Sequence, residues 1–201
     1  MHTTKLMLIL RLIGCNFDYG LCSNWSQNYY HDDFNWTNKY GSTPSYNTGP
    51  FSDHTGYGYY MYIETSAPRQ YGENAKLEFS VSSSDIGKLS CLRFYYHMYG
   101  ETINTLNVYN GNTEIFTKSG NQGNVWLFAK VTVTLQSEIT FEGICGYSFT
   151  GDIAIDDVSI VDGICQGTSR IVVSCLPWLS TSASFINASL FLFWIRKPMA
   201  E

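Results

Sequence analysis

Two stretches of the chain decide its fold: Cys91-Leu-Arg-Phe-Tyr-Tyr-His-Met-Tyr-Gly100 in mid-chain, and Gly151-Asp-Ile-Ala-Ile-Asp-Asp-Val-Ser-Ile160 just ahead of Cys165. Both alternate side chains that suit a core with side chains that suit water, which is the period of a β-strand. Each stretch also carries or leads to a cysteine. Together they predict a disulfide-stapled β-domain of the kind found outside the cell.

Strand patterns recur along the chain with turn residues between them. We expect strands over residues 57–64, 75–81, 89–99, 106–109, 114–116, 126–135, 138–144 and 152–161. Asn110-Gly111 predicts a hairpin, because these residues tolerate the positive φ angles of a type I′ turn. Residues 16–58 are rich in turn formers and predict loops. No segment has a helical period, so the predicted fold class is an all-β sandwich of antiparallel strands.

Composition narrows the classes of protein to consider. The 201 residues suffice for one ordinary domain with extra segments at its ends. Charged residues make up 14% of the chain, against about 25% in a typical globular protein. The net charge of −5 gives no sign of a basic patch, so we expect no nucleic-acid partner.

Cysteines and glycosylation motifs indicate an oxidising compartment. The chain has six cysteines, without the C-x-x-C pairs or the histidine spacing of a zinc site. N-glycosylation motifs begin at Asn24, Asn35 and Asn187. We expect glycans at Asn24 and Asn35, and a protein that is extracellular or on the cell surface.

The two ends of the chain differ from its middle. Residues 1–13 contain only a short apolar run and are interpreted as a leader, either a weak signal segment or a truncated one. Residues 167–201 form an uncertain tail. Within it, residues 171–195 carry no charge and precede Arg196 and Lys197, so one hypothesis is a single membrane-spanning anchor. Asn187 would then lie in the membrane. The other hypothesis is a tail that is not native to the protein.

Residues 14–166 read as one unit, and their motifs are those of a known family. Cys15-Asn-Phe-Asp-Tyr-Gly-Leu-Cys22, Gly49-Pro-Phe-Ser-Asp-His-Thr55 and the two stretches quoted first occur in the family's order. The unit resembles a MAM domain. The resemblance implies a jelly-roll β-sandwich of the concanavalin A-like kind, found as a non-catalytic adhesion and recognition module.

The resemblance also implies a cysteine pattern. It implies disulfides between Cys15 and Cys22 and between Cys91 and Cys165. Two further cysteines depart from the pattern: Cys145 lies where the family often has a basic residue, and Cys175 lies beyond the domain. Three states are open for them, since they could pair with each other, stay free or link two chains.

Catalysis is not indicated by any motif. Asp156 and Asp157 are adjacent, and neighbouring side chains of a strand point to opposite faces, so such a pair cannot act jointly on one bond. The chain has no Gly-x-Ser-x-Gly motif, and its histidines are isolated in sequence. We expect no enzymatic activity and no required cofactor.

A structural Ca²⁺ ion is the one cofactor that the sequence suggests. Asp33, Asp53 and Asp157 match acidic positions of the family, and loop carboxylates are ligands that Ca²⁺ accepts. The alternative is that these aspartates cap turns by accepting backbone N–H groups.

Tyrosines on one strand suggest a recognition surface. Tyr57 and Tyr59 share one face of the expected strand, and Tyr60 and Tyr62 share the other, so one face could meet a partner. The alternative is ordinary strand packing.

The predicted function is protein–protein recognition, including self-association between cells. Two other hypotheses are open. One is a glycan-binding, lectin-like module, which needs exposed aromatic residues beside polar side chains at a groove. The other is an accessory domain of a larger receptor or metalloprotease.

Overall fold

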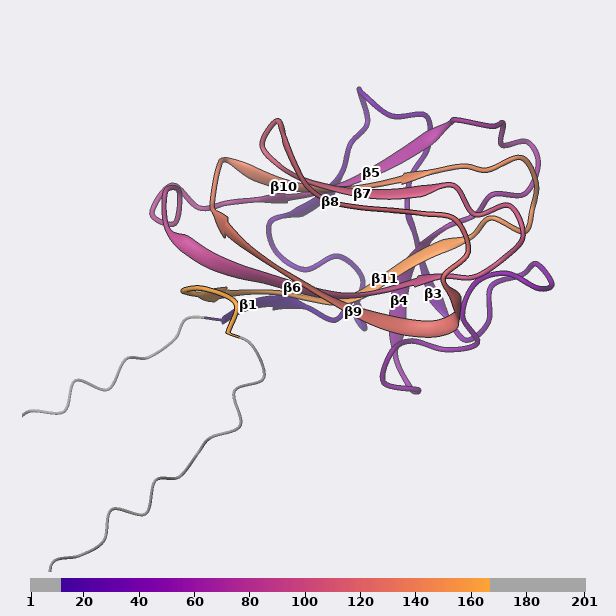
Figure 1. The fold of residues 1–201 in the computed structure, drawn as a ribbon, viewed down its shortest axis with the longest axis horizontal. Helices are drawn as coiled ribbons and strands as arrows, with labels where there is room; N and C mark the ends of the chain where they lie inside the picture. The colour runs from indigo at the N-terminus through magenta and orange to yellow at the C-terminus, as the bar shows by residue number, and fades with distance from the viewer. Residues whose placement is uncertain (1–11, 167–201) are drawn as a thin grey trace, which may run out of the picture. The chain divides into compact units, whose positions relative to one another are not determined.

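The computed structural model describes residues 12–166, which form two antiparallel β-sheets packed face to face (Figure 1). In chain order the strands are β1 (Leu12–Cys15), β2 (Trp25–Gln27), β3 (Thr37–Tyr40), β4 (Tyr59–Ile63), β5 (Asn74–Ser80), β6 (Leu89–Met98), β7 (Thr105–Asn110), β8 (Thr113–Ser119), β9 (Gly123–Thr134), β10 (Glu138–Ile144) and β11 (Ile153–Asp162). The predicted all-β antiparallel sandwich is confirmed.

Six strands make one sheet and five make the other. The first sheet has the order β3-β4-β11-β6-β9, and β1 also pairs with β11. Because β4 pairs with the start of β11 and β1 with its end, the two short strands follow each other along one edge of β11. The second sheet has the order β2-β5-β10-β7-β8. Neighbours in space are thus mostly distant in sequence, as in jelly rolls.

The facing sides of the two sheets share one apolar core. Every second residue of β6 from Leu92 to Met98 is buried against it. Phe94 of β6 meets Phe141 of β10 edge to face, with ring centroids 5.1 Å apart, and this contact joins the sheets. Full burial of such side chains contributes about 1.5–3 kcal/mol each.

Three short strands occur where the sequence predicts only a leader and loops. β2 and β3 have three and four residues, too few to show an alternating pattern. β1 begins inside the expected leader of residues 1–13, because Leu12 and Ile13 pair with Val161 and Ile160. The domain therefore includes Leu12 and Ile13.

The predicted hairpin is present, but its turn is one residue further along. Asn110 pairs with Thr113, so Gly111 and Asn112 are the two turn residues. Gly111 has a φ of +56° and Asn112 is not in the positive-φ region. This is the pattern of a type II′ turn, which places glycine first.

Two disulfides staple the domain. They join Cys15 to Cys22 and Cys91 to Cys165, the pairs that the family resemblance implies. Within residues 12–166 Cys145 has no disulfide partner; it is fully buried in the core, and burial raises the pKa of its thiol to about 12. Cys175 lies outside the described residues.

A long loop, residues 41–58, covers part of the outer face of the six-stranded sheet. Gly41 accepts a hydrogen bond from the hydroxyl of Tyr60 (2.6 Å), and Ser52 accepts one from the indole N–H of Trp126 (3.0 Å). Tyr60 and Tyr62 are buried in a small second cluster on this face. These two tyrosines therefore pack inside the domain, while Tyr57 is exposed.

Two carboxyl groups on this face are also buried. Asp152, just before β11, accepts hydrogen bonds from the backbone N–H and hydroxyl of Thr65 (3.1 and 3.2 Å). Asp156 accepts one from the backbone N–H of His54 (3.0 Å). Burial raises the pKa of each to about 7, and a neighbouring carboxylate adds to the effect in both cases.

The expected membrane anchor at residues 171–195 lies outside the described residues. Residues 12–166 contain no helix that is long and apolar enough to cross a bilayer.

Removing a disulfide should destabilise the domain, and more so for the disulfide that closes the longer loop. Cys91 and Cys165 are 74 residues apart and Cys15 and Cys22 are 7 apart. The chain-entropy relation gives losses of about 4 and about 2.5 kcal/mol for C91A/C165A and C15A/C22A, respectively. Denaturant unfolding measures both values. A larger loss for the short loop would contradict this account.

Stability should fall as the pH rises through the range set by the buried aspartates. Their folded pKa of about 7 lies above the unfolded value of about 3.9. At these two groups the folded state therefore binds more protons, and the stability that they contribute declines from about pH 4 to pH 7. Between pH 5 and pH 8, the wild-type chain should lose on the order of 2 kcal/mol more than D152N. Urea unfolding at both values tests this, with E101Q as the control that keeps the wild-type pH dependence.

Candidate functional site

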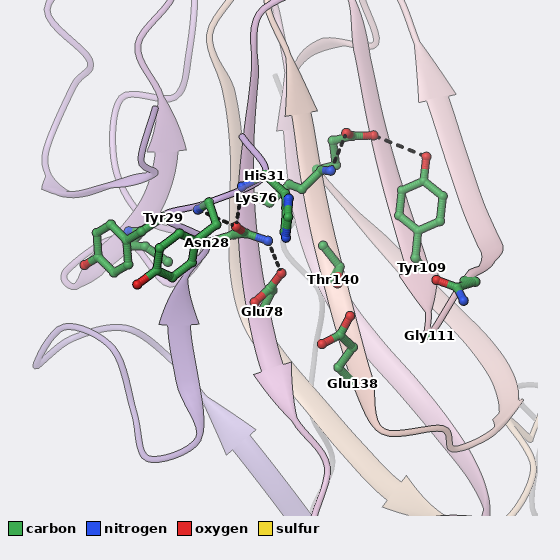
Figure 2. Close-up of a pocket in the computed structure, with 13 residues that line it drawn as sticks. Asn28, Tyr29, His31, Lys76, Glu78, Tyr109, Gly111, Glu138 and Thr140 are labelled. Atoms are coloured by element: carbon green, nitrogen blue, oxygen red, sulfur yellow. Dashed lines mark hydrogen bonds and ion pairs between the residues drawn. The ribbon is translucent and has the colours of Figure 1, made fainter. Parts of the chain in front are cut away.

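A groove of about 670 Å³ crosses the outer face of the five-stranded sheet (Figure 2). Its floor comes from β5, β10 and β7, one rim from residues 27–31, and one end from the β7–β8 turn. The lining residues are Gln27, Asn28, Tyr29, Tyr30, His31, Lys76, Glu78, Tyr109, Gly111, Asn112, Glu138, Thr140 and Glu142. The alternation of the strands explains this polar floor, because the residues between, such as Phe79 and Phe141, enter the core.

Strand register sets the shape of the groove floor. Thr140 of β10 pairs with Glu78 of β5 on one side and with Tyr109 of β7 on the other. Figure 2 shows Thr140 between these two longer side chains. Because the threonine side chain is short, it leaves space above it that the neighbouring residues enclose. Glu138, two residues earlier on the same face of β10, borders this space as well.

Glu142 holds one end of the floor in place through four partners. Its Oε1 accepts a hydrogen bond from Asn74 Nδ2 (2.6 Å) and lies 3.8 Å from Lys76 Nζ. Its Oε2 accepts bonds from Asn107 Nδ2 (3.1 Å) and from the Tyr109 hydroxyl (3.2 Å). Burial raises the pKa of Tyr109, and the charge and hydrogen bond of Glu142 raise it further. The network fixes the Tyr109 ring before a ligand binds.

Asn28 fixes the rim of the groove in a similar way. Its Nδ2 donates to Glu78 Oε1 (2.5 Å), and its Oδ1 accepts the backbone N–H groups of Tyr30 (3.0 Å) and His31 (2.9 Å). This is an Asx-type turn, which orders the segment locally. Tyr29 and Tyr30 remain 71% and 89% exposed, so the rim offers two aromatic rings to the solvent.

The three aspartates proposed as Ca²⁺ ligands do not form one site. Asp33 accepts the backbone N–H of Asn74 (2.9 Å) at the start of β5 in the five-stranded sheet. Asp53 and Asp157 instead lie at the other sheet, within and beneath the covering loop. Among residues 12–166, no group of three or more His, Cys, Asp or Glu side chains is arranged to hold a metal ion. The residues present do not fit a three-aspartate ion site, and a bound Ca²⁺ ion stays a prediction.

Asp53 is bonded as a turn-capping residue. Its Oδ2 accepts the backbone N–H (3.1 Å) and the hydroxyl of Thr55. Burial alone would raise the pKa of Asp53, but these bonds and backbone N–H groups of Gly56 and Gly58 outweigh it and lower the pKa. The turn-capping alternative accounts for its position.

The expectation that Asp156 and Asp157 point to opposite faces is wrong. Asp157 has a φ of +47°, and the pairing of β11 with β6 shifts between Asp156 and Ser159, which marks a bulge. As a result both carboxylates reach His54: Asp156 accepts its backbone N–H, and Asp157 Oδ2 lies 2.7 Å from its Nδ1. The pair ties the covering loop to the sheet.

Both asparagines of the expected glycosylation motifs, Asn24 and Asn35, are exposed. Glycosylation at them stays a prediction, and Asn187 lies outside the described residues. No motif in the sequence singles out the groove residues themselves. Glu78, Thr140 and Glu142 occupy the polar positions of alternating strands, which is also the pattern of an ordinary solvated face.

Comparison with known proteins gives one family and several relatives. A family model described as MAM domain, meprin/A5/mu matches residues 15–166. The MAM and fibronectin type III domain-containing protein 1 of Acropora millepora is 69% identical over 75 residues, covering 37% of this chain and 18% of that protein. The human MAM domain-containing glycosylphosphatidylinositol anchor protein 1 is 40% identical over 166 residues, covering 75% and 17%. The chain thus spans less than a fifth of these two relatives.

A solved structure has a similar fold. The K1 cleaved adhesin domain of Lys-gingipain from Porphyromonas gingivalis W83 superposes with a TM-score of 0.55 at 15% identity, covering 78% of this chain and 99% of that one. At this identity the likeness concerns the fold alone.

Glu142→Ala should destabilise the domain, because it leaves the four partners of a nearly buried carboxylate unpaired. We expect a loss of about 3 kcal/mol in the free energy of unfolding. Glu138→Ala removes the same kind of group from the same strand face without breaking such a network, and should change stability by no more than about 0.5 kcal/mol. Denaturant unfolding measures the free energy of unfolding of both variants. Equal losses in the two would mean that Glu142 does not hold the floor in place.

Proposed function

Because this chain belongs to the MAM domain family, we propose that it acts as a non-catalytic recognition module outside the cell, binding a protein partner through the groove of the five-stranded sheet. The observation that carries the proposal is the groove itself. Its floor and rim are ordered by hydrogen bonds within the domain, so little side-chain freedom is lost when a partner binds.

Two features support an extracellular location. Two disulfides staple the domain, and such bonds persist in oxidising compartments. The human relative is named as a glycosylphosphatidylinositol anchor protein, which associates that relative with membranes. Together these features support a cell-surface or secreted protein.

The rim supports a protein partner. Tyr29 and Tyr30 are largely exposed beside a polar floor, and exposed tyrosines are enriched at protein interfaces, where they contribute large contact areas with few rotatable bonds. A second copy of the chain is one such partner, as expected of a homophilic adhesion module.

One observation favours a second candidate, a glycan ligand. The groove places exposed aromatic rings next to Asn, Thr and Glu side chains, which is the arrangement that a lectin-like site requires. The experiment below separates the two candidates.

Thr140→Trp should block recognition, because a large ring at this position fills the space between Glu78 and Tyr109 without changing the charge. Thr134→Trp places the same ring at an exposed position of β9 in the other sheet and is the matched control. The 201-residue chain, secreted with its disulfides formed and tetramerised, is tested for binding to cell surfaces before and after protease treatment of the cells, and on a glycan array. Sedimentation velocity, with and without millimolar Ca²⁺, measures self-association and tests the predicted ion.

We expect protease-sensitive binding or self-association that T140W weakens at least tenfold and T134W leaves unchanged. If T140W binds as strongly as the wild-type chain, the groove is not the binding site. Binding confined to the glycan array and lost in T140W would select the second candidate and overturn the first.

A further inference from the structure

The groove carries an excess of negative charge. Three glutamates and one lysine line it, and His31 is exposed on its rim. Lys76 lies 3.8 Å from Glu142 Oε1, so these two charges offset each other. Glu78 accepts its hydrogen bond from Asn28, which is neutral. No hydrogen bond or ion pair within residues 12–166 holds the side chain of Glu138.

Glu78 and Glu138 are therefore the two groove carboxylates for which the described residues provide no ion pair. They come from neighbouring strands: Glu78 pairs with Thr140, and Glu138 stands two residues further along the same face. Diagonal neighbours of this kind lie about 7–8 Å apart. Like charges at such a distance repel each other, and a cation placed between them would relieve the repulsion.

The side chains around the space above Thr140 have the chemistry for such a cation. Carboxylates of Glu78 and Glu138 border it on two sides, and the ring of Tyr109, held by Glu142, borders it on another. A guanidinium group offers several N–H donors in one plane, enough to reach two carboxylates, and its face is attracted to an aromatic ring.

We propose that the groove binds a basic side chain of the partner protein, with arginine preferred to lysine, above Thr140 and between Glu78 and Glu138. This inference rests on the proposed function of the groove as a protein-recognition site and names the chemistry of its partner. A neutral sugar could hydrogen-bond to the carboxylates but would leave their repulsion in place. The acidic pair therefore favours a basic peptide over a neutral glycan.

The test uses the uniformly ¹⁵N-labelled 201-residue chain and the capped peptide acetyl-Gly-Gly-Arg-Gly-Gly-amide, whose single charge is the guanidinium group. The same peptide with citrulline in place of arginine is matched in shape and lacks the charge. We expect the arginine peptide to shift amide resonances of residues 76–78, 109 and 138–142, and added NaCl to weaken binding. The citrulline peptide should bind at least tenfold more weakly.

Variants of the two glutamates test whether binding of the arginine peptide depends on their charge. E78Q/E138Q keeps the shape of both side chains and should weaken arginine binding at least tenfold, while the single variant E78Q should give an intermediate loss. E101Q removes an exposed carboxylate outside the groove and should bind as the wild type does. A well-dispersed spectrum of each variant shows that it has folded.

Three results would overturn the inference: equal binding of the citrulline peptide, shifts confined to residues outside the groove, or unchanged binding by E78Q/E138Q. The proposed function can survive this failure. If T140W abolishes protease-sensitive cell binding while no arginine peptide binds the groove, the site is correct and its partner is not recognised through a basic residue. If T140W also has no effect on cell binding, both proposals fall.

Discussion

The contact of Phe94 with Phe141 is the constraint on which the rest of the domain depends. It joins the two sheets through aromatic side chains of β6 and β10. Since side chains alternate along a strand, placing Phe141 in the core sends Thr140 and Glu142 to the opposite face. The polar floor of the groove is therefore a direct consequence of how the core is packed. A shift of one residue in β10 would exchange the two sets and destroy both core and groove.

Strand length explains which parts of the fold are predictable. β6 and β11 have ten residues each, and their alternation is long enough to identify them from sequence. β2 has three residues, so its pairing with β5 decides its conformation more than its own pattern does. The turn between β7 and β8 is displaced by one residue from the Asn-Gly motif, because Asn110 still pairs with Thr113 and the glycine takes the first turn position.

The sites are less predictable than the fold, because they depend on contacts between distant strands. Glu78 and Thr140 become neighbours only through the pairing of β5 with β10. Side chains of β11 alternate between the two faces of the sheet as far as Asp156. The bulge at Asp157, a local backbone feature, then turns both carboxylates toward His54. Matching acidic positions to a family pattern could not show that Asp33 lies beside a different sheet from the one that contains Asp157, since only the three-dimensional arrangement separates them.

The alternation of Thr140 with Phe141 also bears on how such domains diverge. Inward positions of β5 and β10 are constrained by close packing, whereas outward positions such as Glu138 and Thr140 line the groove. Exchanges at outward positions other than Glu142 can therefore accumulate without disturbing the core. In this way one fold can acquire new ligand preferences through substitutions at a few surface positions, while the core that determines the fold is retained.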